Sequence, residues 1–448
     1  MVVSDLHLGE ANSLFTPRNR SGFQIIEAFS KALADLISQF NQESLPKLVL
    51  NGDILGLSFS DYVHSFEIFE AFIEACTIKN ILCDTIIYIP GNHDHHIWNL
   101  AKEGHFLKGL ENTNLNKIEA LHSVTPPTFT DGFSSNFLDA FAKRIGNDSL
   151  TFKIFYPNFM VPPPEQGGPY LLFHHGHFSE KTYYFVSKFL QTIYPELPTP
   201  ENLEELESQN GPFIDFAFSE LGRSGKAGHF FEKLMSTLSN KELFEIRVDE
   251  MAENIAKNVD FPYLPSDWLE KQLAKTLLQN IGEKVRGERY KGSVTCSDET
   301  IQGLLHYLNT YCSETLSENG WSGEDVTLIW GHTHKPFQKQ TTTDHFPKLT
   351  LYNSGGWVLP RAVTPVIGAS ILFVSDSNET QSLRIYNDAE TGGKMHFEII
   401  QEDGFEITEF SKKINEGIRD ETGALRKEWK DLKSSIISEI KERRKDVT

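Results

Sequence analysis

Short apolar runs alternate with helically spaced apolar residues through the first hundred positions of the chain. Pro46–Leu50 and Thr85–Pro90 are aliphatic or β-branched runs beside turn-forming residues, a pattern typical of buried strands. Apolar residues recur at helical spacing from about residue 22 to 40, and again from Phe66 to Cys76. This alternation predicts a mostly parallel sheet covered by helices, with functional groups at the carboxyl ends of the strands.

The later chain predicts further strands and helices. A helix is expected at Phe137–Ile145, and strands at Leu150–Tyr156 and Pro169–Phe173. Five short strands and one amphipathic helix follow residue 321: Val326–Trp330, Leu349–Tyr352, Ile371–Val374, Leu383–Tyr386, Phe397–Ile400 and a helix with its apolar face from Leu425 to Ile440. Short strands in succession suggest antiparallel pairing on a second sheet.

Residues 178–321 differ from the rest, since they show helical periodicity, as at Leu269, Leu273 and Leu277, and little strand signal. The segment is too long for an ordinary loop. The predicted domains are therefore a first core segment, a helical insertion, a second core segment and a C-terminal helical extension, at residues 1–177, 178–321, 322–404 and 405–448. Val2 and Val3 resemble the end of a strand without its beginning, so we expect the natural chain to start further upstream.

Composition limits the classes of molecule that this protein is expected to bind. A net charge of −20 over 448 residues argues against a nonspecific nucleic-acid binder but does not exclude a small phosphorylated substrate, because metal ions can supply positive charge locally. No apolar run approaches the roughly 18 residues of a membrane span. The four cysteines form no C-x-x-C pair, which favours reduced thiols and a cytoplasmic protein. A homo-oligomer is compatible with the sequence, and the slightly basic C-terminal helix is expected to dock on the body, on a second subunit or on an anionic surface.

Polar clusters follow most of the predicted strands. They are Asp5-x-His7, Gly52-Asp53, Gly91-Asn92-His93-Asp94, His175-Gly176-His177 and Gly331-His332-Thr333-His334. Carboxylate, imidazole and amide donors without thiolate suit a pair of divalent ions such as Mn, Fe or Zn. Two ions about 3.5–4 Å apart can clamp a phosphoryl group and lower the pKa of a bound water to produce hydroxide.

These motifs resemble those of the calcineurin-like metallophosphoesterase superfamily, which read D-x-H, G-D, G-N-H-D/E, H-G-H and G-H-x-H. Val3–Gly9 and Asn353–Trp357 look most like the bacterial branch that contains UDP-diacylglucosamine pyrophosphohydrolases. The resemblance implies an α/β fold, specifically a four-layer α/β/β/α sandwich, here with a large helical insertion and a C-terminal helix.

The resemblance also implies roles for individual residues. Asp5, His7 and His334 would hold one ion; Asn92, His175 and His332 would hold the other, and Asp53 would bridge them. His93 would bind the phosphate and protonate the leaving oxygen. Manganese is the expected metal, with iron or zinc as alternatives. His174 and His177 are candidates for contacts to ligands or substrate, whereas His95 and His96 are expected to have packing or surface roles.

Three departures from the family pattern affect this assignment. Many relatives carry G-D-x-x-D, whose second Asp orients the catalytic His, but this chain has Gly56 there. The orienting group is then missing or comes from elsewhere, with Asp94 as the candidate. The UDP-diacylglucosamine branch tends to have Arg where this chain has His93. No Arg precedes Gly91, unlike in the Ser/Thr protein phosphatases.

The leading hypothesis is a dinuclear-metal phosphoesterase that hydrolyses a phosphodiester or a nucleotide-type pyrophosphate, with His93 and Asp94 as catalytic residues. The alternatives are a phosphomonoesterase or protein phosphatase, a nuclease of the same superfamily, and a non-catalytic metal-binding scaffold. Because the insertion separates two ligand motifs, we expect it to wall the site and to determine substrate choice.

Overall fold

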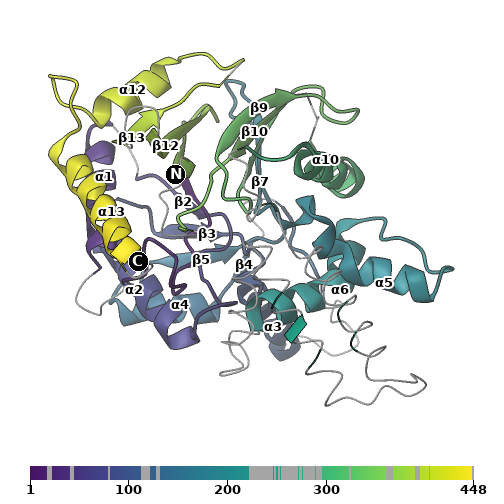
Figure 1. The fold of residues 1–448 in the computed structure, drawn as a ribbon. Helices are drawn as coiled ribbons and strands as arrows, with labels where there is room; N and C mark the ends of the chain where they lie inside the picture. Colours follow the sequence, from purple (N-terminus) through teal and green to yellow (C-terminus); the bar gives the residue numbers. More distant parts are fainter. Residues whose placement is uncertain are drawn as a thin grey trace.

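Two β-sheets packed face to face form the centre of the computed structural model of this chain, and helices cover their outer faces (Figure 1). The structure describes most of the chain in eleven ranges plus seven isolated positions between 246 and 288; the ranges are 1–17, 23–40, 45–78, 81–112, 122–127, 132–220, 295–321, 324–359, 367–388, 394–402 and 404–445.

The first sheet has eight strands in the order β13-β12-β11-β1-β2-β3-β5-β4. Its parallel centre consists of β1 (Val2–Val3), β2 (Leu48–Leu50), β3 (Thr85–Tyr88) and β5 (Thr151–Ile154). Antiparallel strands flank it: β4 (Phe133–Ser134) on one side, and β11 (Ile367–Val374), β12 (Thr380–Asp388) and β13 (Lys394–Ile399) on the other.

The second sheet has five strands in the order β6-β7-β8-β10-β9. They are β6 (Asn158–Val161), β7 (Tyr170–His174), β8 (Val326–Trp330), β10 (Leu349–Asn353) and β9 (Phe337–Thr341). The expectation that all the late strands share a second sheet is therefore wrong for β11, β12 and β13. Val2 pairs with Leu372 of β11, and this pairing covers the edge that β1, which is fully buried, would otherwise leave open.

The burial of alternate residues confirms the four-layer α/β/β/α prediction. Val3 contributes to the core under the helices of the first sheet, whereas Val2 contributes to a core shared by both sheets. In β8, Leu328 faces a third core beneath a second set of helices, and Ile329 faces the shared one. Successive strand residues point to opposite faces, so each sheet packs against helices on one side and against the other sheet on its second side.

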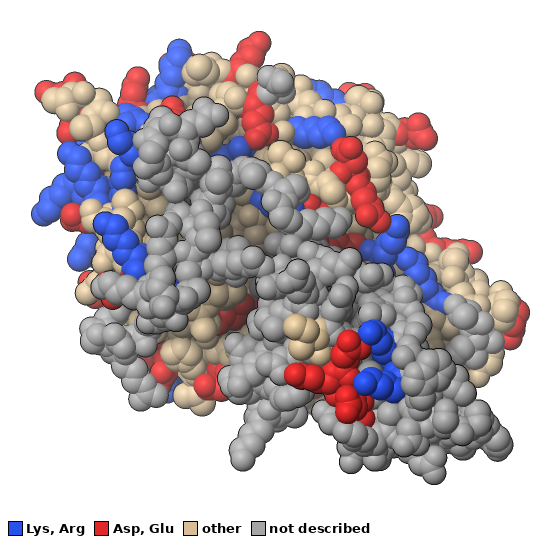
Figure 2. Space-filling model, in the orientation of Figure 1, with Lys and Arg blue, Asp and Glu red and all other residues tan. Residues whose placement is uncertain are grey.

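Helices of the first layer pack on the outer face of the first sheet. These are α1 (Gln24–Ser38), α2 (Tyr62–Ile78), α4 (Asn136–Arg144) and α13 (Lys427–Lys445), while α3 (His95–Asn112) and α12 (Glu409–Gly417) lie nearby. The predicted C-terminal helix docks on the body, because Trp429, Leu432 and Ile436 of α13 are buried in the same core as α1. Figure 2 shows Lys and Arg side chains gathered at the edge where α13 lies in Figure 1.

The described ends of the predicted insertion form the fourth layer, over the second sheet. They contain only helical elements: η2 (His177–Ser179), η3 (Lys181–Tyr184), α5 (Phe185–Ile193), α6 (Leu203–Ile214), η4 (Asp215–Glu220), α10 (Asp298–Tyr307), η7 (Leu308–Cys312) and α11 (Ser313–Glu318). Most of residues 221–294, including the periodic leucines from Leu269 to Leu277, lie outside the described residues, so the domain boundaries stay a prediction. Among the described helices, none combines the length and apolar character needed to cross a membrane.

Candidate metal centre

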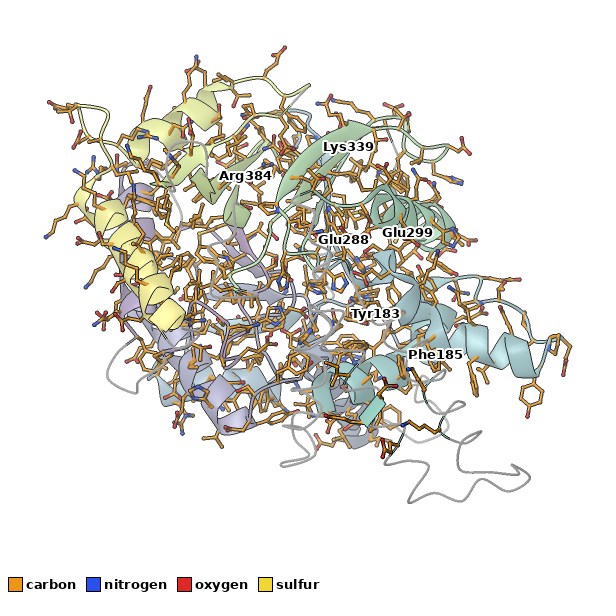
Figure 3. All side chains as sticks on the ribbon, in the orientation of Figure 1. Tyr183, Phe185, Glu288, Glu299, Lys339 and Arg384 are labelled. Carbon is orange, nitrogen blue, oxygen red and sulfur yellow. The ribbon has the colours of Figure 1, made fainter. Side chains whose placement is uncertain are left out.

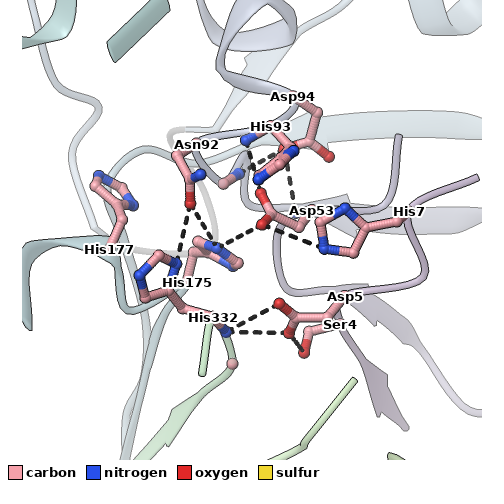
Figure 4. Close-up of polar contacts among 12 residues, drawn as sticks. Ser4, Asp5, His7, Asp53, Asn92, His93, Asp94, His175, His177 and His332 are labelled. Atoms are coloured by element: carbon pink, nitrogen blue, oxygen red, sulfur yellow. Dashed lines mark hydrogen bonds and ion pairs between the residues drawn. The ribbon is translucent and has the colours of Figure 1, made fainter. Parts of the chain in front are cut away.

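The predicted site residues meet where strands of both sheets end. Asp5 and His7 follow β1, Asp53 follows β2, and Asn92 and His93 follow β3. From the second sheet, His175 follows β7, while His332 and His334 follow β8. Figure 4 shows most of these side chains, from Asp5 to His332, converging on one small region, although more than three hundred residues separate the first motif from the last.

The backbone at these positions is unusual. Among the described non-glycine residues, six have positive φ, and all but Asn378 belong to the motifs: Asp5 (52°), His7 (47°), Asp53 (51°), His332 (68°) and His334 (59°). Left-handed backbone is costly for residues with a Cβ and persists only where the surroundings impose it. Hydrogen bonds between the loops do so, since Asp5 N–H donates to Gly52 O and His7 N–H donates to Asp53 O, both at 2.9 Å.

One group of donors is formed by Asp5, His7 and His334. Asp5 Oδ1 lies 3.2 Å from His334 Nε2, and the Nε2 atoms of His7 and His334 are 3.1 Å apart. The Asp5 carboxylate is fully buried and accepts the backbone N–H of His332. The three side chains thus present one donor atom each to a common point.

The other group is formed by Asn92, His175 and His332. Asn92 Oδ1 lies 3.2 Å from His175 Nε2 and 3.0 Å from His332 Nδ1. Asp53 lies between the two groups, with its Oδ2 atom 3.2 Å from His175 Nε2 and 3.6 Å from His7 Nε2. Burial alone would raise the pKa of Asp53, but the neighbouring His175 and His93 hold it well below its ordinary value. An ionised Asp53 is therefore placed to bridge two cations.

The donor set fits two divalent cations. Several rings present one nitrogen to the centre and direct the other to an oxygen: His7 Nδ1 to Glu10 at 2.8 Å, His332 Nε2 to Glu180 at 3.2 Å, and His175 Nδ1 to the carbonyl of Asn51 at 3.2 Å. Such outer contacts fix the ring and make the inner nitrogen a better ligand. The facing nitrogens of His7 and His334 can share at most one proton, whereas a cation can accept both lone pairs.

Glu10 is a site residue that was not predicted. Its carboxylate is 2% exposed and lies 2.8 Å from His7 Nδ1 and 3.2 Å from His93 Nδ1. Burial lowers the pKa of His93, while Asp53 and Glu10 raise it. For the Glu10 carboxyl, burial acts in the opposite direction and would raise the pKa, but His7 and His93 hold this pKa well below its ordinary value. Its position three residues after His7 is the signal that could have revealed it.

The Asp94 carboxylate accepts hydrogen bonds from two neighbouring loops. Its carboxylate accepts backbone N–H groups from Ile54 at 2.8 Å and Gly91 at 2.6 Å, and the hydroxyl of Tyr88 at 2.5 Å. These bonds tie the loop after β2 to the loop after β3. Glu10 Oε1 lies 3.2 Å from His93 Nδ1, which makes Glu10 a further candidate, besides Asp94, for the group that orients His93.

The four remaining candidate histidines lie outside both donor groups. His174 and His177 are buried, and the ring of His174 lies 4.5 Å from that of Tyr307, centroid to centroid. His177 Nε2 is 3.3 Å from the Tyr156 hydroxyl. His95 and His96 begin α3 and face acidic residues of α6 and η4, and His95 is buried.

Comparison with known proteins identifies the family. A profile of the calcineurin-like phosphoesterases matches residues 1–243, more than half of the chain. The chain belongs to the calcineurin-like phosphoesterase family. It is accordingly a metal-dependent phosphoric ester hydrolase with a dinuclear centre for divalent ions. The match ends before Gly331–His334, and it is the structure that brings this last motif to the other four.

Other comparisons are distant. A crystal structure of a dimetal phosphatase from Danio rerio aligns over 86% of this chain and 91% of that chain, with 13% sequence identity and a TM-score of 0.27. A TM-score this low is below the level at which two folds are considered the same. A search of curated proteins finds no significant match.

Proposed function

We propose that this phosphoesterase hydrolyses a small phosphodiester or a nucleotide-type pyrophosphate. The observation that supports this most directly is the position of Asp53 between two donor groups, with His93 beside it. We assign Asp5, His7 and His334 to one ion, Asn92, His175 and His332 to the other, and Asp53 to both. Manganese is the metal we expect, with iron or zinc as alternatives, because nitrogen and oxygen donors without sulfur suit all three ions.

The bound ions would supply positive charge to the phosphoryl oxygens and lower the pKa of a bound water. Residues of the chain itself would position the substrate and protonate the leaving oxygen. His93 is held by its backbone N–H, which donates to Asp53 Oδ1 at 2.8 Å, and by Glu10 at its Nδ1 atom. We assign the contact with the substrate to the opposite nitrogen, Nε2. A charged phosphate beside the ring raises its pKa, so His93 can protonate the leaving oxygen.

Aromatic residues from the segment 178–321 support a substrate with an organic group. The ring of Tyr183 (Figure 3) lies 5.3 Å from that of His332, and the ring of Phe218 lies 6.4 Å from that of His93, centroid to centroid. Tyr183 and Phe218 also contact each other at 5.1 Å. This wall excludes water from one side of the centre and offers a flat apolar surface to a base or an alcohol.

His93 stands where the UDP-diacylglucosamine pyrophosphohydrolase branch tends to have Arg, so we favour general phosphoester chemistry over the exact substrate of that branch. The four cysteines form no disulfide, which supports a reducing compartment such as the cytoplasm. A phosphomonoester remains the alternative substrate class, because the same donors would stabilise its transition state.

The deciding experiment compares bis(p-nitrophenyl) phosphate with p-nitrophenyl phosphate on metal-stripped protein reloaded with Mn²⁺. We expect diester cleavage to depend on the metal, to exceed monoester cleavage, and to fall by roughly 10²–10⁴-fold in His93→Ala, the usual contribution of a general acid. The same variant should still bind two ions. A preference for the monoester would favour a phosphatase, and two bound ions without turnover of either ester would favour a scaffold.

A further inference from the structure

A second set of metal-type donors lies at the start of α3, apart from the catalytic groups. His96 Nδ1 is 2.8 Å from Glu220 Oε1 and 3.6 Å from Asp215 Oδ1. All three donor atoms lie within 4.8 Å of one another. The spacing resembles that in the catalytic groups, where His175 and His7 lie 3.2 and 3.6 Å from Asp53.

The local backbone explains how both carboxylates reach His96. Asp215 and Glu220 are the first and last residues of η4, which is a π-helix. In an α-helix, with 3.6 residues per turn, residues five apart point in clearly different directions. The wider turn of a π-helix brings them toward the same side, and such segments are frequent at functional sites.

Asp215 presents a buried carboxylate oxygen to the rings of His95 and His96. Its Oδ1 atom is buried and accepts no hydrogen bond of ordinary geometry from the described residues, although it lies 3.5 Å from His95 Nδ1 and 3.6 Å from His96 Nδ1. His95 is held from behind by Glu207, whose Oε1 atom is 2.8 Å from His95 Nε2. A buried histidine that orients a carboxylate in this way is typical of the layer around a metal ligand.

We propose that His96, Asp215 and Glu220 bind a third divalent transition-metal ion, separate from the dinuclear centre. One imidazole and two carboxylates form a donor set that suits Zn²⁺ or Mn²⁺. Three carboxylates, those of Asp215, Glu220 and Glu207, gather here around two imidazoles, and a dication offsets the excess of negative charge within this group.

The ion would join the segment 178–321 to the catalytic loop. Ser219 Oγ donates to the carbonyl oxygen of Asn92 at 3.0 Å, and Phe218 belongs to the aromatic wall beside His93. Both residues lie in η4, between the two acidic ligands. Binding at this site therefore holds the wall against the dinuclear centre without supplying a group to it.

The test counts ions on the full chain. Metal-stripped protein is saturated with Zn²⁺, desalted and analysed for zinc per chain, with calorimetric titration in parallel. We expect three ions on the wild type and two on Glu220→Gln and on His96→Gln. Glu103→Gln is the matched control, because Glu103 is an exposed residue of the same helix α3 and loses the same charge; it should retain three.

Each result distinguishes a third metal site from a set of ion pairs. Two ions on the wild type, or three on both variants, would overturn the proposal and leave the cluster as a set of ion pairs. No bound ions on the wild type would also overturn the dinuclear centre, so the two failures are distinguishable. Glu220→Gln and His96→Gln each remove a different ligand, so if one variant fails to fold, the metal count of the other still tests the proposal. Diester cleavage by the folded variant shows that it keeps the dinuclear centre.

Discussion

Glu10 occupies the space that a side chain at position 56 would need. A Cβ atom added to Gly56 would overlap the Cγ atom of Glu10. The related motif G-D-x-x-D places an Asp at this position, where it orients the catalytic histidine. In this chain the carboxylate comes from the loop after β1, and the glycine leaves room for it. The two residues therefore form a matched exchange that keeps a carboxylate beside His93.

This exchange predicts a reciprocal rescue. Glu10→Ala should lower kcat for a diester by roughly 10–100-fold, the usual effect of removing a group that orients a ligand or a catalytic histidine. Gly56→Asp alone should also be impaired, because the new side chain meets Glu10. The double variant should recover much of the lost activity, as measured by kcat at saturating Mn²⁺. If the double variant were as slow as the worse single one, the exchange would not be functional.

Asp94 predicts an effect on stability. Asp94→Ala leaves the buried N–H groups of Ile54 and Gly91 and the Tyr88 hydroxyl without their acceptor. Each unsatisfied buried donor costs about 1–3 kcal/mol, so the free energy of unfolding should fall by several kcal/mol. Urea titration of the metal-free chain measures this. His93→Ala is the control and should change the free energy of unfolding much less, and a reversed order would contradict the structural role of Asp94.

Metal removal should destabilise the whole fold. Asp5 and Asp53 belong to the first sheet and His175, His332 and His334 to the second, so the ions are bound only while the sheets stay packed. A ligand at 1,000 times its Kd stabilises the native state by about 4 kcal/mol per site. We expect the melting temperature to fall with a chelator and to return with Mn²⁺. An unchanged melting temperature would mean that the donors bind no ion tightly.

His95 predicts a pH dependence in the metal-free chain. Burial would lower its pKa, but Asp215 and Glu207 outweigh this effect and raise the pKa from 6.5 to about 9. The charged ring thus contributes its full stability below about pH 6.5, and the contribution is lost as the pH rises through about 9. Between these values the free energy of unfolding should fall by about 1–3 kcal/mol more in the wild type than in His95→Gln. Equal slopes for the two proteins would contradict this.

The periodic signals predicted most of the fold, because they come from burial within single elements. The strands at Thr85–Tyr88 and Val326–Trp330 and the helix α4 lie where the pattern placed them. These signals could not predict which of the two sheets each strand joins. β11 follows β10 in the chain but crosses to the first sheet to cover β1, and no local pattern encodes such a crossing.

The ligand candidates followed from motifs that are local in the sequence, and the structure brings them together. Glu10 and Asp94 show what local reasoning misses. Both are carboxylates next to a motif, and only the path of the loop decides that one faces an imidazole and the other faces backbone N–H groups. The aromatic wall escaped prediction for the same reason, because Tyr183 and Phe218 are thirty-five residues apart and resemble ordinary core residues.

The order of the donors along the chain has a consequence for synthesis. The last two ligands, His332 and His334, emerge from the ribosome long after Asp5, His7 and Asp53. Until then, the nascent first sheet displays carboxylates and imidazoles in an incomplete set, with the chemistry to bind metal loosely. The donor set of the dinuclear centre is therefore incomplete until residue 334 has been synthesised. Complete coordination of the two ions therefore requires both the synthesis of His334 and the packing of the second sheet against the first.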